Sequence, residues 1–229
     1  VKFYQASTSE MFGDNDFSEQ SETTPFAPSS PYAAAKLYAH NMVRIYRKGY
    51  GIFACNGILF NHESPLRGLE FVTRKITNGI AKISLGLEDI IELGNIDAKR
   101  DWGYAPEYVE AMWLMMQQEE PDDYVIATNE TRTVREFVET AFRHVGIDVE
   151  WQGKGVDEIG INKANGKTIV KVNKQFFRPA EVDILLGDPS KAEKALGWKR
   201  EIDFSQLVER MVKNDLAITE HEIKVNDIK

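Results

Sequence analysis

The chain has 229 residues, enough to bury a sizeable hydrophobic core in one large domain or in a domain with a smaller partner. Hydrophobic residues make up 42% and charged residues 28%, a balance typical of a folded globular protein rather than a disordered one. The net charge of −8 argues against a protein that binds nucleic acid or anionic membranes, because such surfaces are basic.

The cysteine and histidine content indicates neither disulfides nor a metal site. Cys55 is the single cysteine, so no internal disulfide can form and nothing points to an oxidising compartment. The four histidines do not have the spacing of metal ligands. No apolar run approaches the ~20 residues that span a bilayer. We therefore expect a cytoplasmic protein that holds no metal and binds neither nucleic acid nor membrane.

The chain begins in a strand-like run. Residues 1–6 indicate a buried strand, which leads into the hydroxyl-rich residues 7–9 and then a polar loop over 14–29. Because the chain opens on Val1, without an initiator Met, and enters this strand at once, we expect it to be part of a longer protein.

Helix boundaries are marked at several places. Ser30 as N-cap and Pro31 at the first helical position predict a helix that runs to about Lys48 and is ended by Gly49. The later elements, in chain order, are a strand over 51–60, a turn-rich loop over 61–69, a helix over 71–85, a short strand over 89–93, a helix over 106–119, a strand over 124–128, a helix from 133 to 144, a hairpin around 165–166, a short helix between 188 and 197, and a helix from 204 to about 220.

Local signals support several of these elements. Thr133 and Glu136 form a capping box. Asn165 and Gly166 predict a two-residue hairpin turn. We expect the charged tail beyond Glu220 to be mobile. Strands that alternate with helices predict a parallel α/β sheet, and the later elements with their hairpin predict a smaller mixed lobe.

Two residues on the first helix have the spacing of an acid–base pair. Tyr32 and Lys36 lie about one turn apart, so both side chains emerge on one face. A free tyrosine has a pKa near 10, and making it a base at neutral pH costs roughly 4 kcal/mol, a cost that a nearby ammonium lowers. A favourable helix start alone would give the same pattern, so the pair is weak evidence by itself.

A strand-end cluster strengthens this interpretation. Thr8, Ser9 and Glu10 lie about two dozen residues before Tyr32, at the kind of strand end where ligands of open α/β sheets bind. Taken together, these residues resemble the active site of the extended short-chain dehydrogenases/reductases. Within that group, the order Thr-Ser-Glu resembles a 4,6-dehydratase site, although it also occurs in UDP-glucuronate decarboxylases.

Longer matching segments narrow the resemblance to one family of nucleotide-sugar enzymes. Residues 54–76, 100–103 and 176–189 are similar, almost word for word, to the GDP-mannose 4,6-dehydratases, and the resemblance runs from residue 1 to about 215. Enzymes that act on UDP- and dTDP-sugars usually have Asn-x-Tyr-Gly-Pro where this chain has Asn61-His62-Glu63-Ser64-Pro65.

The resemblance implies a role for each matching residue. Thr8, Glu10, Tyr32 and Lys36 would be catalytic, with Tyr32 and Lys36 also contacting the cofactor; Ser9 would contact the substrate and Asn61 its hexose; Lys75, Arg100 and Arg178 would hold the diphosphate; Glu181 would contact guanine or ribose; and His62 and Arg67 would reach an NADP phosphate. The family usually has two arginines before Gly68, whereas here the first is Leu66.

The resemblance also implies the architecture and the partners. The fold would be α/β, the C-terminal portion of a Rossmann-type doubly wound parallel sheet with a smaller mixed α/β substrate-binding lobe. Residues 1–60 and 104–130 would belong to the NADP-binding domain, residues 61–103 and 131–220 mainly to the lobe, and residues 221–229 to a tail. The substrate would be GDP-mannose, the cofactor NADP and the assembly a homodimer or homotetramer. The Gly-rich dinucleotide turn would lie upstream of Val1, so we expect the isolated chain to be inactive.

Two alternatives stay open on the residues alone. One is another nucleotide-sugar enzyme, such as a UDP-glucuronate decarboxylase. The other is a non-catalytic protein with a dehydratase-like C-terminal half, although the presence of Thr8, Glu10, Tyr32 and Lys36 argues against it.

Overall fold

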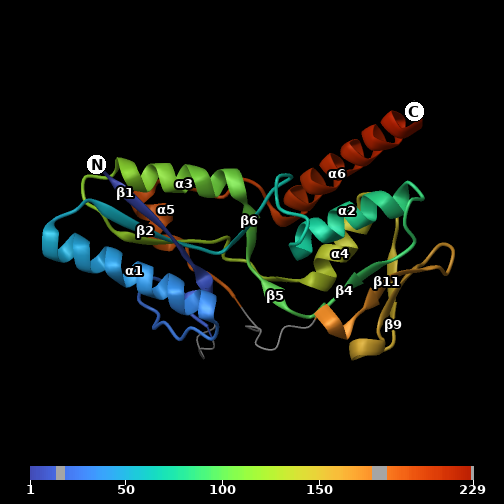
Figure 1. Cartoon of the computed structure of the whole chain (residues 1–229), viewed down its shortest axis with the longest axis horizontal. Coiled ribbons are helices and arrows are strands. Elements are labelled where there is room, and N and C mark those ends of the chain that lie inside the picture. Colours follow the sequence, from blue (N-terminus) through green and yellow to red (C-terminus); the bar gives the residue numbers. More distant parts are fainter. Residues whose placement is uncertain (14–18, 177–184, 228–229) are drawn as a thin grey trace. The chain divides into compact units, whose positions relative to one another are not determined.

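The computed structural model describes residues 1–13, 19–176 and 185–227, which form two compact units. The first unit holds residues 1–13, 19–62, 98–132 and 185–203. The second holds residues 63–97, 133–176 and 204–227. Each unit is therefore assembled from chain segments that are far apart in the sequence (Figure 1).

The first unit is built on a three-stranded parallel sheet in the order β1-β2-β7. Its strands are β1 (Phe3–Thr8), β2 (Ala54–Leu59) and β7 (Asp123–Ile126). In Figure 1 the sheet runs between α1 (Pro31–Tyr50) and α3 (Ala105–Gln117), and α5 (Ser190–Leu196) packs with α3. The predicted parallel α/β sheet is confirmed.

Two apolar clusters cover the two faces of this sheet. Successive β2 residues point to opposite faces, so Cys55 and Leu59 join one cluster while Ile58 joins the other. Every residue of β2 is buried, as expected for the central strand of a parallel sheet that is covered on both sides. The sheet face that α1 covers also carries buried polar groups, among them Ser7 and Asn56.

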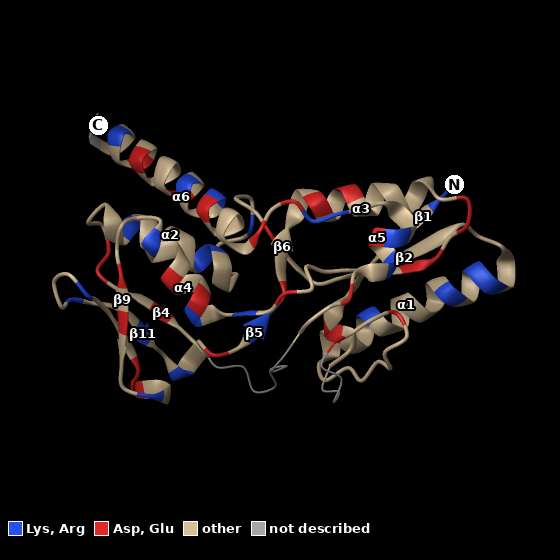
Figure 2. Ribbon diagram, turned by 180° about the vertical axis from the view of Figure 1, so that it is seen from behind, with Lys and Arg blue, Asp and Glu red and all other residues tan. Residues whose placement is uncertain are grey.

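Helix α1 begins where the sequence predicted but ends later. The Ser30 hydroxyl accepts a hydrogen bond from the backbone N–H of Ala33 at 3.1 Å, and Pro31 opens the helix. The predicted stop at Gly49 is wrong, because the helix continues through it and ends at Gly51, whose φ of 63° is left-handed. All charged residues of α1 are basic, and most of them lie in its C-terminal half (Figure 2), where they complement the helix dipole.

Several short elements follow the strands of this sheet. Thr8 caps η1 (Ser9–Met11), a 3₁₀ turn. The segment after β2 is not only loop, as predicted, because β3 (Asn61–Glu63) pairs with β6 (Trp102–Tyr104). A second two-stranded ladder joins β5 (Lys99–Arg100) to β8 (Arg132–Thr133).

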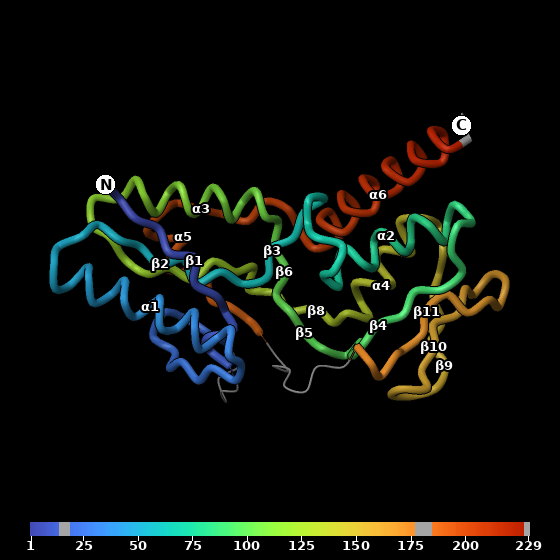
Figure 3. The backbone as a smooth tube through the Cα atoms, in the orientation of Figure 1, coloured from blue at the N-terminus to red at the C-terminus, as the bar shows by residue number. Residues whose placement is uncertain are grey.

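The second unit combines three helices with a mixed sheet. The helices are α2 (Val72–Ser84), α4 (Val134–Arg143) and α6 (Phe204–Asp227). The sheet has the order β4-β11-β10-β9, traced in Figure 3, with strands β4 (Ile91–Leu93), β9 (Val149–Gln152), β10 (Ile159–Asn162) and β11 (Thr168–Val172). Two 3₁₀ turns, η2 (Gly155–Asp157) and η3 (Lys174–Phe176), flank β10 and β11. The predicted capping box is confirmed, since Thr133 and Glu136 each accept from the other's backbone N–H.

The hairpin between β10 and β11 has a longer turn than the sequence predicted. The two strands pair antiparallel, as expected, but the backbone N–H of Asn162 donates to the carbonyl of Lys167, which leaves residues 163–166 in the loop. The Asn162 side chain accepts from the N–H of Ala164, and the Asn162 carbonyl accepts from those of Asn165 and Gly166. These local bonds stabilise a wider turn than the two residues Asn165 and Gly166 could form alone.

Helix α6 extends through the segment predicted to be a mobile tail. It continues past Glu220 to Asp227, and its sequence contains no Gly or Pro that would end it. Its buried positions Phe204, Leu207, Val208 and Met211 recur at helical spacing. Among the described residues, no helix is both long and apolar enough to cross a membrane.

A buried ion pair joins α2 to α6. The Asp215 side chain is fully buried and accepts from Arg74 Nε at 2.7 Å and from Thr77 Oγ1 at 2.6 Å. Arg74 Nη1 also donates to the carbonyls of Pro65 and Arg67, so the same guanidinium holds the chain that leads into α2.

Replacing Asp215 with Ala should lower the free energy of unfolding by about 3–5 kcal/mol, because it leaves the Arg74 guanidinium in a largely buried place without its counter-charge. Urea unfolding followed by circular dichroism measures the change. Lys213→Ala is the matched control, since Lys213 forms an exposed pair with Glu209 on the same helix and should change stability by less than about 1 kcal/mol. Equal effects of the two substitutions would contradict a structural role for the Arg74–Asp215 pair.

Candidate active site

The first group of candidate residues lies where β1 ends. The Thr8 hydroxyl accepts a hydrogen bond from the backbone N–H of Glu10 at 3.3 Å, and this bond starts the η1 turn. Thr8 and Glu10 are half-buried, whereas Ser9 is only 3% exposed. Of these three predicted site residues, Thr8 and Glu10 therefore present more surface to a ligand.

Helix α1 packs against β1 and η1 and brings Tyr32 and Lys36 to the same end of the strand. Lys36 Nζ donates to the Ala6 carbonyl at 2.9 Å and lies 5.7 Å from the centre of the Tyr32 ring. The Tyr32 side chain is 54% exposed. An exposed phenol beside an ammonium, at the end of a strand that carries a hydroxyl and a carboxylate, can accept and donate protons at one bound molecule.

Asn61 and His62 follow β2. The Asn61 Oδ1 atom is buried and accepts no hydrogen bond from the described residues. Such an acceptor is costly to bury without a partner, and a ligand hydroxyl would supply the donor. His62 Nδ1 lies 2.8 Å from the Phe60 carbonyl, and its ring stacks on Tyr108 with centroids 5.0 Å apart, which fixes the orientation of the imidazole.

The segment of Arg100 is held by the residue that follows it. Asp101 is fully buried, and its carboxylate accepts from the backbone N–H of Thr128 at 2.9 Å, from the Thr128 hydroxyl at 2.7 Å and from the Gly187 N–H at 3.3 Å. Burial raises the pKa of Asp101 to about 6, although these hydrogen bonds act in the opposite direction. Asp101 thereby ties the Arg100 segment to the residues that follow β7 and to Gly187.

Arg67 lies in the second unit and forms an ion pair. Its Nε is 3.2 Å from Glu63 Oε2, and its guanidinium lies 3.5 Å from the centre of the Phe71 ring. Burial raises the pKa of Glu63, while Arg67 and a hydrogen bond from Thr73 act to lower it. The neighbouring Leu66 is 93% exposed.

Lys75, also in the second unit, lies on an aromatic ring. Its ammonium is 3.6 Å from the centre of the Phe176 ring. Burial lowers the pKa of Lys75, and the nearby Glu92 opposes that shift. The other two predicted substrate contacts, Arg178 and Glu181, lie outside the described residues.

Sequence reasoning missed two parts of this region. Asp101 stood within a matched string without a role, and nothing local in the sequence showed that Thr128 and Gly187 would meet it. His40 was assigned no role from the sequence, although its position one turn beyond Lys36 was a signal that it faces β1. In the part of the chain that the structure describes, no group of three or more His, Cys, Asp or Glu residues is placed to hold a metal ion.

A comparison with protein families matches residues 1–211 to the model described as GDP-mannose 4,6 dehydratase. Among curated proteins, the GDP-mannose 4,6 dehydratase of Drosophila melanogaster is 55% identical, with 95% of this chain and 55% of that protein covered. The protein of the same name from Homo sapiens is 56% identical, with coverage of 95% and 59%. That from Dictyostelium discoideum is 54% identical, with coverage of 99% and 64%. The chain thus spans about three fifths of the length of these relatives.

Solved structures with the same fold are more distant in sequence. RMD from Pseudomonas aeruginosa complexed with NADPH superposes with a TM-score of 0.78 at 20% identity, covering 94% of this chain and 66% of that one. The dTDP-glucose 4,6-dehydratase of Bacillus anthracis in complex with NAD gives a TM-score of 0.77 at 20% identity, covering 96% and 63%. These likenesses support the Rossmann-type α/β fold.

The raised pKa of Asp101 predicts a pH-dependent contribution to stability. The unfolded chain releases this proton near pH 3.8 and the folded chain near 6, so the folded state holds it more tightly in between. The stability that Asp101 provides should therefore be full below about pH 4 and be lost as the pH rises through 6. The gap between the folded and unfolded pKa corresponds to about 3 kcal/mol of folding free energy.

Urea unfolding of the wild type and of Asp101→Asn at pH 4, 5, 6 and 7 measures this contribution, because the amide cannot ionise. The free energy of unfolding of the wild type should fall relative to the variant as the pH rises. A difference between the two proteins that grows in favour of the wild type with rising pH would contradict the raised pKa.

Proposed function

Because the chain belongs to the GDP-mannose 4,6-dehydratase family, we propose that the protein of which it forms part converts GDP-mannose to GDP-4-keto-6-deoxymannose. The observation that carries the proposal is the packing of α1 on the end of β1, which gathers Thr8, Glu10, Tyr32 and Lys36. The chain spans about three fifths of its relatives, so the proposal concerns the intact gene product.

Tyr32 acts first in this proposal. Its phenolate takes the proton of the C4 hydroxyl, and Lys36 favours the phenolate by its charge. Lys36 is itself positioned by its bond to the Ala6 carbonyl, which uses one of the three ammonium donors. NADP, when bound, supplies the hydride acceptor at C4 and the hydride donor at C6.

Glu10 and Thr8 act on the ketone that results. Glu10 removes the proton at C5, which the C4 carbonyl has made acidic, and passes it to the departing C6 hydroxyl. The C5–H and C6–O bonds break, a C5–C6 double bond forms, and one water leaves with Glu10 again ionised. When the hydride returns to C6, C5 takes up one proton, which balances the proton that Tyr32 took from the C4 hydroxyl. The Thr8 hydroxyl donates to the C4 oxygen, where negative charge develops during the proton removal.

The remaining candidate residues bind the two ligands in this proposal. Asn61 Oδ1, which has no hydrogen-bond partner among the described residues, accepts a hydrogen bond from a hexose hydroxyl. Ser9 lies beside Thr8 at the same end of β1. Lys75, Arg100 and Arg178 neutralise the diphosphate, for which more than one cation is needed. Glu181 accepts from guanine or ribose.

Four residues fit the proposed NADP site to different degrees. Tyr32 and Lys36 offer an exposed phenol and an ammonium on one helix face, which suits the ribose and nicotinamide end of the cofactor. His62 is already oriented by Phe60 and Tyr108. Arg67 would have to share its guanidinium between Glu63 and a phosphate, so its contribution depends on the competition between the two anions.

We further propose a homodimer or homotetramer. Helix α1 exposes large apolar side chains, among them Tyr38 and the stacked rings of Tyr46 and Tyr50, whose centroids are 5.1 Å apart. Leu66 adds a further exposed apolar side chain. Large apolar side chains that are exposed together on one helix are typical of contact surfaces.

The function is tested by mixing the intact gene product with GDP-mannose and NADP⁺ and following the nucleotide sugar by mass spectrometry. We expect a product lighter by one water, without net consumption of NADP⁺. UDP-glucuronate serves as the competing substrate. Turnover of UDP-glucuronate with no reaction of GDP-mannose would overturn the proposal.

The roles of Tyr32 and Glu10 predict two different failures. Tyr32→Phe should abolish even the transient reduction of NADP⁺, whereas Glu10→Gln should still oxidise C4 and accumulate reduced cofactor without dehydration. Loss of a positioned acid or base typically costs about 10²–10⁴-fold in rate, so both variants should be slow overall, at different steps. Single-turnover absorbance of reduced nicotinamide separates them. A reduced-cofactor signal in Tyr32→Phe and none in Glu10→Gln would show that the assigned roles are reversed.

A further inference from the structure

We propose that His40 and Ser7 are positioning residues, which lock α1 onto β1 so that Tyr32 and Lys36 are held beside Thr8 and Glu10. This inference rests on the proposed function and deepens it, because it assigns a role in the reaction to buried groups that do not touch the substrate. His40 is 1% exposed and Ser7 is 4% exposed, and Ser7 Oγ lies 3.0 Å from His40 Nδ1.

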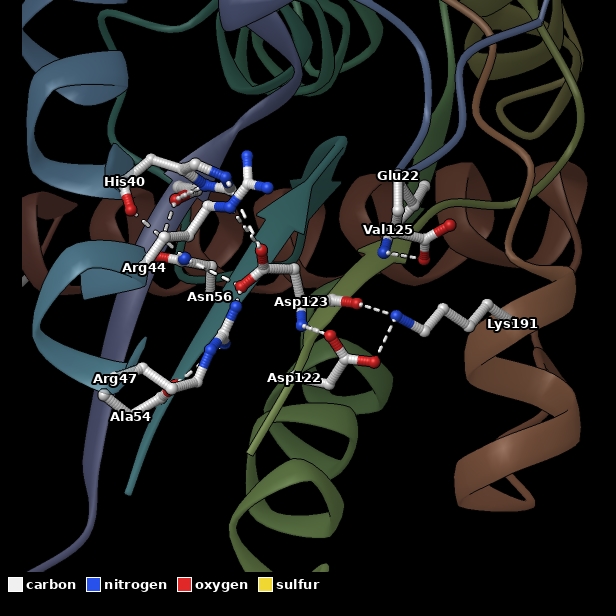
Figure 4. A network of polar contacts seen from close by, with 11 residues as sticks. Glu22, His40, Arg44, Arg47, Ala54, Asn56, Asp122, Asp123, Val125 and Lys191 are labelled. Carbon is white, nitrogen blue, oxygen red and sulfur yellow. Dashed lines mark hydrogen bonds and ion pairs between the residues drawn. The ribbon is translucent and has the colours of Figure 1, made fainter. Parts of the chain in front are cut away.

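The network that holds His40 is centred on Asp123, as Figure 4 shows. The Asp123 carboxylate accepts from Arg47 Nη1 at 2.9 Å and from Asn56 Nδ2 at 2.8 Å. Arg44 Nε lies 3.6 Å and His40 Nε2 3.8 Å from its other oxygen. Burial by itself would raise the pKa of Asp123, but the bonds from Arg47 and Asn56 and the nearby positive charges outweigh it and keep the pKa below its ordinary value.

The ionised Asp123 carboxylate sets the tautomer of His40. Burial lowers the pKa of His40, and the charges of Arg44 and Arg47 lower it further while Asp123 acts to raise it, so the ring is neutral at physiological pH. Because Nε2 faces the carboxylate, the one ring proton belongs on Nε2. Nδ1 is then an acceptor, and the Ser7 hydroxyl donates to it at 3.0 Å in preference to the more distant Asn56 Oδ1 at 3.5 Å.

This bond lies next to the candidate catalytic residues on both elements. Ser7 directly precedes Thr8 on β1, and His40 lies one turn after Lys36 on α1. Together with the bond from Lys36 Nζ to the Ala6 carbonyl, it gives α1 two polar attachments to the last residues of β1. Apolar packing alone tolerates small slides of a helix, whereas a hydrogen bond has a strict distance and angle and therefore fixes the register.

Ser7, His40 and Asp123 have the residue types of a nucleophilic triad, but they cannot act as one. The Ser7 hydroxyl is buried between the sheet and α1, and Phe26 packs its ring edge-on against His40 with centroids 5.1 Å apart. No substrate carbonyl can reach the hydroxyl, so the arrangement stabilises structure and does not carry out acyl transfer.

The test uses four variants of the intact gene product. Ser7→Ala removes the donor to Nδ1. His40→Gln carries its amide further along the side chain, toward Asp123, and loses the contact with Ser7. His40→Asn places its Oδ1 near the position of Nδ1 and keeps an acceptor for the Ser7 hydroxyl. Val43→Ala is the matched control, because Val43 is buried on the same helix without a part in the polar network.

We expect Ser7→Ala and His40→Gln to lower kcat for GDP-mannose by about 10- to 100-fold, since small misplacements of catalytic groups are that costly, while KM is unchanged. His40→Asn should retain most of kcat, and so should Val43→Ala, even if it melts at a lower temperature. The double variant Ser7→Ala/His40→Gln should be no slower than either single variant, because both remove one interaction. A loss of kcat in Val43→Ala equal to that in His40→Gln, or no rescue by His40→Asn, would overturn the assignment.

Amide hydrogen exchange tests the positioning without relying on turnover. Exchange over residues 3–11 and 31–39 should be faster in Ser7→Ala and His40→Gln than in the wild type, but not in Val43→Ala. If the wild type fails to convert GDP-mannose while this pattern is observed, the function is wrong and the lock between α1 and β1 stands. Unchanged exchange in both Ser7→Ala and His40→Gln would refute the lock itself.

Discussion

The largely buried carboxylate of Asp123 is the constraint on which the first unit depends. A charge between a sheet and a helix is costly unless it is fully paired, and here the partners come from β2 and α1. Arg47 also donates to the Ala54 carbonyl, so one guanidinium bonds to both β2 and β7. Satisfying this charge helps to fix α1 on the sheet, and with it Tyr32 and Lys36, beside the bonds that Ser7 and Ala6 form with the helix.

The second unit also contains a carboxylate that is paired with an arginine of another helix. Asp215 on α6 is paired with Arg74 on α2, and the same guanidinium donates to two carbonyls of the chain before α2. That chain carries Leu66 and Arg67. In both units a carboxylate that is largely or fully buried on one element holds an arginine of another.

The parts of the structure that could be predicted are those determined by neighbours in the sequence. Ser30 and Pro31 fixed the start of α1, Thr133 and Glu136 that of α4, and Gly197 the end of α5, because a cap requires only residues within a few positions. The end of α1 was missed because Gly49 and Gly51 offer equal local signals, and only the backbone at Gly51 turns left-handed. Asp101 and Asp123 could not be assigned at all. Their partners Thr128, Gly187 and Arg47 are 27, 86 and 76 residues away, and only the folded chain brings them together.

Exposure divides the polar groups of the first unit into two kinds. Tyr32 reaches solvent and Thr8 and Glu10 are half-buried, whereas Ser7, His40 and Asn56 directly behind them are buried and bonded to one another. Reactive groups must be reached by a ligand, so they cannot be held by being packed on all sides. Their geometry therefore has to be fixed by neighbouring residues that are packed on all sides. An apolar core of the same shape would avoid the cost of desolvating Ser7, His40, Asn56 and Asp123. The polar network is explained by its structural specificity, because its hydrogen bonds fix the register of one helix against one strand.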